Sequence, residues 1–187
     1  MAQFPLHTRA TAPFEAKAIL DQTSQAMGYV PALIAQMAEA PALLEGYAAL
    51  SAIFRKTAFP PAEQQLVLLT VSVEHESHYC TPAHTVRARD ATLDEAVITA
   101  IRAGRSIADP RLEALRLFTL KMVRERGFLA DADLDTFIAA GFTRANALEI
   151  TLAVGLKTLS NYVNHIAETP LDPQLVADAI GGERCVA

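Results

Sequence analysis

Apolar residues recur every three or four positions along most of the chain, which is the spacing of helices that bury one face. Capping residues or prolines open most of these segments, for example Thr92 with Glu95 as its capping-box partner. No segment shows the clear alternation of a half-buried strand. The pattern predicts one all-α domain over residues 1–187, a bundle of eight or nine helices at residues 14–27, 32–39, 41–54, 61–73, 92–104, 110–127, 131–140 and 143–168, with one more from residue 80 or 81.

The segment at residues 66–71 is apolar on all sides of a helix. A helix of this kind is normally a buried one. A buried strand is the alternative, because valine and threonine are abundant here. The length of the pattern and the helices on either side favour a central buried helix.

Reactive side chains are concentrated directly after that segment, in residues 74–84. Three of the five histidines and one of the two cysteines lie there. A break is predicted near residues 78–79, and a new helix from residue 80 or 81 carries Pro82 in its first turn. Cys80 would then lie at a helix N-terminus, where the helix dipole favours a thiolate. His84 is four residues further on and would share the helix face of Cys80.

Composition and charge narrow the class of protein. Half of the 187 residues are hydrophobic and a fifth are charged, as in a globular domain. The net charge of −5 gives no basic surface for nucleic acid, and no apolar run has the length of a membrane span. The N-terminal residues lack the features of a signal peptide. Two cysteines do not make a disulfide framework, so a reducing cytoplasm is the expected location.

Several stretches together resemble a known family. They are residues 61–72, the sequence Tyr-Cys-Thr-Pro-Ala-His at 79–84, residues 28–31 with 40–44, and residues 159–165 with 169–172. The chain resembles the carboxymuconolactone decarboxylase family over residues 4–175, in its alkylhydroperoxidase-D-like (AhpD-like), peroxidase-related branch. The resemblance implies an all-α homo-oligomer, a dimer, trimer or hexamer, whose redox chemistry needs no metal and no other cofactor.

The resemblance also implies a site. In the redox branch, a Cys-x-x-Cys pair is followed by a histidine, and a glutamate on the preceding helix completes a proton relay. By position, Cys80 matches the second cysteine and His84 the histidine, whereas Ser77 replaces the first cysteine and Gln65 the glutamate. Ser77 cannot form a disulfide and the amide of Gln65 cannot take a proton. Glu74 or Glu76 is the expected substitute base.

The leading hypothesis is a one-cysteine thiol peroxidase. Cys80 would attack a small-molecule peroxide and become a sulfenic acid. His84 would stabilise the thiolate or relay a proton to the leaving oxygen. An external thiol, a thioredoxin-like reductant or Cys185 would then restore the thiol.

Other hypotheses stay open. A carboxymuconolactone-type decarboxylase would need a cationic anchor and a proton donor, for which Arg87, Arg89 and His84 are the candidates. An oligomeric binding protein could have kept the fold without catalysis, with Cys80 as a packing residue. A metal site is a further possibility, formed by His75, His78, Cys80 and His84 with nearby carboxylates. Asn161, Asn164 and His165 are expected to form a polar network at a subunit contact.

Overall fold

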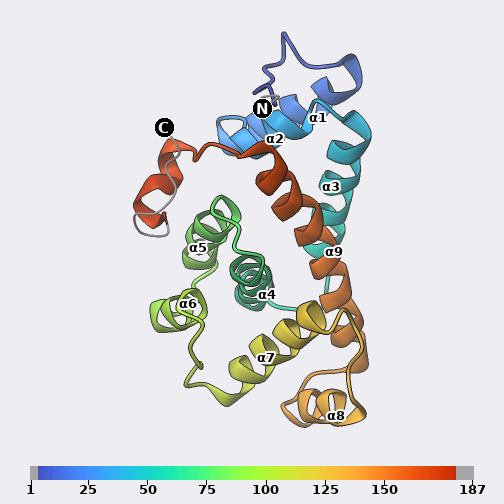
Figure 1. Ribbon diagram of the computed structural model, residues 1–187, viewed down its shortest axis with the longest axis vertical. Helices are drawn as coiled ribbons and strands as arrows, with labels where there is room; N and C mark the ends of the chain where they lie inside the picture. The colour runs from blue at the N-terminus through green and yellow to red at the C-terminus, as the bar shows by residue number, and fades with distance from the viewer. Residues whose placement is uncertain (1–3, 180–187) are drawn as a thin grey trace.

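The computed structural model describes residues 4–179, which form nine α-helices and two short 3-10 helices without any strand (Figure 1). The prediction of an all-α bundle is confirmed for this part of the chain. Its elements in order are η1 (Phe14–Ala16), α1 (Lys17–Met27), α2 (Ala32–Met37), α3 (Pro41–Phe54), α4 (Pro61–Glu74), α5 (Cys80–Asp90), α6 (Glu95–Arg102), α7 (Pro110–Arg124), α8 (Asp131–Ala139), α9 (Arg144–Ala167) and η2 (Pro173–Asp178).

Helix α4 lies in the middle of the bundle and packs against α5, α6, α7 and α9 (Figure 1). Its apolar middle is buried on every side, including Leu66, Leu69 and Val71. The hydroxyl of Thr70 is also buried, and it donates to the Leu66 carbonyl at 2.8 Å. This bond leaves no unpaired polar group in the helix core. The segment is therefore a buried helix, and the alternative of a buried strand is wrong.

Helix α9 is the longest element and packs against α2, α3, α4 and α7. It begins at a capping box in which the Thr143 hydroxyl accepts the Asn146 N–H at 3.1 Å. The buried polar residues Lys157, Asn161 and Asn164 follow one another at helical spacing along its inner side. This spacing directs three polar side chains into the interior along one stripe.

The predicted break before Cys80 is present. Helix α4 ends at Glu74, and Glu76 adopts a left-handed conformation with φ of 52°. The Ser77 N–H then donates to the Ser72 carbonyl at 3.0 Å, and the Ser77 hydroxyl accepts the Cys80 N–H at 3.2 Å. The chain can therefore turn back beside α4 with the first amide of α5 satisfied.

The start of the sixth helix differs from the prediction. Asp94, and not Thr92, is the N-cap of α6, and its carboxylate accepts the Ala96 N–H at 2.7 Å. Thr92 instead has φ of 60°, and its N–H bonds the Arg89 carbonyl at 2.8 Å. Thr92 therefore belongs to the turn that ends α5, and the N-cap of α6 lies two residues later.

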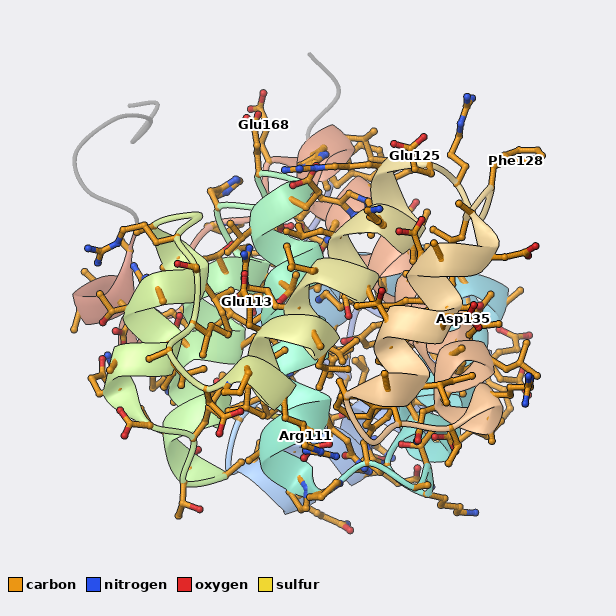
Figure 2. All side chains as sticks on the ribbon, turned by 90° about the horizontal axis from the view of Figure 1, so that it is seen from below. Arg111, Glu113, Glu125, Phe128, Asp135 and Glu168 are labelled. Atoms are coloured by element: carbon orange, nitrogen blue, oxygen red, sulfur yellow. The ribbon has the colours of Figure 1, made fainter. Side chains whose placement is uncertain are left out.

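The surface is charged, with local apolar exposure. Figure 2 shows Glu125 and Glu168 on the outside of the bundle and Phe128 projecting from the turn between α7 and α8. Helix α9 exposes an apolar stripe formed by Leu148, Tyr162 and Ile166. No single helix in residues 4–179 is long and apolar enough to cross a membrane; only α8 and α9 taken together, bent by 111° at their junction, reach that length and composition.

Candidate thiol site

Cys80 is the first residue of α5 and is buried, with 2% of its surface exposed. The prediction that this cysteine lies at a helix N-terminus is confirmed. Its side chain packs in an apolar cluster with Leu33, Met37 and Leu44 from the N-terminal helices. A thiol in such surroundings is shielded from bulk water, so its chemistry depends on the few polar groups beside it.

His84 lies one turn further along α5 and is also buried. Its Nδ1–H donates to the Oε1 atom of Gln65 at 3.0 Å. Because an amide oxygen can only accept, this bond leaves Nε2 as the acceptor nitrogen of the ring. Burial above all, and then the positive charges of Lys157 and Arg87, hold the pKa of His84 well below its ordinary value. The imidazole is therefore neutral near pH 7.

Lys157 lies beside both His84 and Cys80. It comes from the middle of α9 and is 1% exposed. Its Nζ donates to His84 Nε2 at 3.0 Å, and Cys80 lies one turn before His84 on the same helix. Burial lowers the pKa of Lys157, and the neighbouring Cys80 partly offsets this shift. We call Cys80, His84 and Lys157 the buried triad. A lysine in such a place can remain as a neutral amine or form an ion pair with a thiolate.

The two replaced family positions have structural roles here. Gln65 contacts His84 in the way expected of the relay glutamate, but it orients the ring without taking a proton. The Ser77 hydroxyl donates to Asn164 Oδ1 at 2.7 Å while it accepts the Cys80 N–H. Ser77 thus fixes the start of α5 against α9, and it supplies no second thiol.

The structure does not bring Glu74 or Glu76 to Cys80. Glu74 pairs with Arg124 of α7 through two contacts of 2.6 and 2.8 Å. Glu76 is exposed in the turn before α5. Within residues 4–179 neither carboxylate bonds to Cys80, because α4 ends with its acidic side chain on the side that packs against α7. The ionisable partner of the thiol is Lys157 instead.

The polar residues at the end of α9 form a network inside the chain. Asn161 Nδ2 donates to His75 Nδ1 at 3.0 Å, and Asn164 accepts from Ser77. Both asparagines are fully buried, so these contacts join α9 to the α4–α5 turn within one molecule. His165, by contrast, is exposed and lies outside the network.

The histidines of residues 74–84 do not converge on a metal ion. His75 bonds Asn161, and His78 Nε2 donates to the Thr169 carbonyl at 3.0 Å. No three histidine, cysteine, aspartate or glutamate side chains in the described part of the chain are grouped so as to hold a metal ion.

Tyr79 anchors the other side of the site. Its hydroxyl donates to Asp172 at 2.5 Å, and the same carboxylate accepts the Ala32 N–H at 3.0 Å. Burial, and then the bond to Asp172, raise the pKa of Tyr79 far above its ordinary value. The phenol therefore stays protonated and ties the C-terminal segment to both α2 and α5.

The two arginines of α5 differ in their surroundings. Arg89 binds Glu95 at 2.8 Å and Asp178 at 2.7 Å, so its guanidinium is already neutralised. Arg87 lowers the pKa of His84 and of Lys157, after the larger effect of burial. Its positive charge therefore favours an anion at the buried triad.

Two buried side-chain oxygens near the triad have no hydrogen-bond partner among the described residues. One is Oγ1 of Thr81, next to Cys80, and the other is Oδ1 of Asn161, one turn from Lys157. Unpaired buried polar atoms are rare and are often completed by a bound molecule.

A separate groove of about 550 Å³ lies between α7, α8 and α9. Phe118, Met122, Leu134 and Val154 form part of its apolar wall, and His75 lies at its edge. Cys80, His84 and Lys157 do not line it. The groove and the buried triad are therefore different places in the molecule.

The fold and the site together describe an all-α protein with a reactive type of side chain, the Cys80 thiol, in its interior. Residues 38–119 match the sequence profile of the Carboxymuconolactone decarboxylase family. The matched segment runs from the end of α2 into α7, and the structure has the AhpD-like fold. No curated protein matches the sequence.

Several solved structures share the fold. An uncharacterized peroxidase-related protein from Ralstonia eutropha JMP134, described as an alkylhydroperoxidase AhpD core, has a TM-score of 0.83 and 20% identity, over 92% of this chain and 93% of its own. A peroxidase-related protein from Silicibacter sp. TM1040 has a TM-score of 0.79 and 18% identity, over 93% and 92%. The debrominase Bmp8, as a cysteine-to-alanine variant in complex with 2,3,4-tribromopyrrole, has a TM-score of 0.78 and 15% identity, over 95% of both chains. At these identities the likeness concerns the fold.

Proposed function

We propose that the chain is a one-cysteine thiol peroxidase in which Cys80 is the attacking group and Lys157 its proton acceptor. The observation that carries the proposal is a buried amine 3.0 Å from His84 Nε2, where His84 is one turn after the buried Cys80 on α5. A base this close can take the thiol proton, and the resulting thiolate and ammonium would stabilise each other. Lys157 would then accept the proton, which is the role of a carboxylate in the family relay.

The reaction balances with these groups alone. Lys157 takes the proton from Cys80, and the thiolate attacks one oxygen of the peroxide. The new S–O bond forms as the O–O bond breaks, and the leaving oxygen takes the proton back from Lys157. The products are a Cys80 sulfenic acid and an alcohol or water. Two equivalents of an external thiol return the sulfenic acid to the thiol and leave as a disulfide.

Other features support this assignment. Two of the structural relatives are named as peroxidase-related. The unpaired oxygens of Thr81 and Asn161 offer hydrogen bonds to a small polar substrate. Because only 2% of Cys80 is exposed, we expect hydrogen peroxide to react faster than a bulky organic hydroperoxide. A decarboxylase is the second candidate that the family supports. It is less favoured, because Arg89 is already bound to two carboxylates.

The test combines a thiolate titration with a stoichiometric hydrogen peroxide challenge. We would use a Cys185→Ser background, so that Cys80 is the only thiol. Trapping of a sulfenic acid, its loss in Cys80→Ser and slower trapping in His84→Ala would support the proposal. A Cys80 thiol that titrates near the free value of about 8.5 and gives no sulfenic acid would refute it.

A further inference from the structure

The buried triad raises the question of what happens to the Cys80 sulfenic acid once it has formed. In a two-cysteine site a neighbouring thiol captures it as a disulfide. Here that place belongs to Ser77, whose hydroxyl is already bonded to Asn164 and to the Cys80 N–H. The nearby nucleophile is the amine of Lys157, which lies 3.0 Å from Nε2 of His84, one turn after Cys80 on α5.

We propose that Lys157 acts as a nitrogen resolving group, and that its Nζ captures the oxidised Cys80 as a Cys80–Lys157 sulfenamide. This inference rests on the proposed function, because the peroxide reaction supplies the sulfenic acid. Condensation of a sulfenic acid with a nitrogen is an established reversible step of cysteine oxidation. The same reaction between Cys80 and Lys157 would protect Cys80 from further oxidation without a second cysteine.

The step needs no further oxidant. The Nζ lone pair attacks Sγ, an S–N bond forms, and the S–O bond breaks. The amine loses one proton, which His84 Nε2 is placed to accept because it already receives a hydrogen bond from Nζ at 3.0 Å. The departing hydroxide takes up a proton and leaves as water. An external dithiol reverses the reaction by attacking Sγ, which frees the amine and produces a disulfide of the reductant.

The surroundings favour capture over further oxidation. Cys80 and Lys157 are 2% and 1% exposed, so a second peroxide reaches the sulfur less easily than a group that is already buried beside it. An amine must be uncharged to attack, and burial lowers the pKa of Lys157 in that direction. Gln65 holds His84 with Nε2 toward Lys157, which keeps the proton acceptor in place.

The test uses the full chain in the Cys185→Ser background, in which no intramolecular disulfide is possible. After one equivalent of hydrogen peroxide we expect an intact mass lower by about 2 Da, restored by dithiothreitol. Trypsin cannot cleave after a modified Lys157, so the digest should link residues 57–87 to residues 145–184. Lys157→Met should abolish the link. It also removes the proton acceptor, so Cys80 should be oxidised more slowly, but the product that forms should remain a sulfenic acid, about 16 Da heavier than the thiol.

Lys121→Met is the matched control. This lysine lies on the exposed surface of α7, where it pairs with Asp133, and its replacement should leave the link unchanged. If the native protein instead gains about 16 Da at Cys80 and gives no linked peptide, the sulfenamide is refuted and the peroxidase stands. If Cys80 is not oxidised in any variant, both proposals fail.

Discussion

Replacing Gln65 by glutamate restores the carboxylate that this chain lacks, and its effect on His84 can be worked out from the structure. The Gln65 oxygen lies 3.0 Å from His84 Nδ1. A full negative charge at that distance would favour the imidazolium by about 5 kcal/mol at an effective dielectric constant near 20. Desolvation of the new carboxylate cancels part of this Coulomb energy. In proteins an adjacent opposite charge typically shifts a pKa by about 1–3 units, which corresponds to about 1.4–4 kcal/mol. We therefore expect Gln65→Glu to raise the pKa of His84 by about 1–3 units.

The lowered pKa of His84 also makes the stability of the folded protein depend on pH. In the native protein the pKa of His84 is lowered below its unfolded value, so the unfolded chain binds more protons between the two values. The stability that depends on a neutral His84 is present above about pH 6.5 and is lost as the pH falls toward the folded pKa. Gln65→Glu should make this acid-side loss shallower, because the folded protein can now carry the proton.

Proton NMR of the histidine ring signals, assigned with His84→Ala, measures the pKa directly. Urea unfolding midpoints at several pH values measure the change in stability. Gln25→Glu, an exposed position on α1, introduces the same charge away from the site and should leave the His84 titration unchanged. An unshifted or further lowered His84 pKa in Gln65→Glu would show that the Gln65 contact does not govern this ring.

Three further outcomes are expected. Tyr79→Phe leaves the buried Asp172 carboxylate without its phenol donor and should lower the free energy of unfolding by about 1–3 kcal/mol, measured by urea denaturation; no loss would mean that the bond adds nothing to stability. In the Cys185→Ser background, Ser77→Cys should restore a disulfide with Cys80, seen as loss of both free thiols after one equivalent of peroxide; two thiols that persist would contradict the positional match. We also propose that the apolar stripe of α9 is a subunit contact of a homo-oligomer, so Ile166→Glu should reduce the mass measured by light scattering, and an unchanged mass would place the contact elsewhere.

Local sequence patterns were enough for the helices and for part of the site. The spacing of apolar residues predicted the buried α4, and the prolines and the four-residue interval placed Cys80 and His84 on one face of α5. The fate of Glu74 could not be predicted in this way. Its position at the end of α4 is compatible with facing either neighbour, and only the packing of α7 decides that it pairs with Arg124.

Lys157 was missed for a related reason. Within an amphipathic pattern a single lysine is normally a solvent-facing residue, and nothing adjacent to it suggests burial. Its partner His84 lies 73 positions earlier in the sequence. The one available sign was the spacing from Lys157 to Asn161 and Asn164, which places three polar residues on the side of α9 that its apolar neighbours bury. A polar stripe on a buried helix face calls for polar partners elsewhere in the chain.

The two departures from the family site, at positions 65 and 77, fit one another when Lys157 is considered with them. With a glutamate at position 65, the relay would carry a negative charge next to His84, and a buried lysine beyond it would be held as an ammonium ion. Gln65 removes that charge, so burial and Arg87 can act on Lys157 in the direction of the neutral amine. A neutral amine can both accept the Cys80 proton and attack an oxidised sulfur, which an ammonium ion cannot do. Ser77 then removes the competing thiol and holds the start of α5 against α9, the helix that supplies Lys157 as the nearby nucleophile.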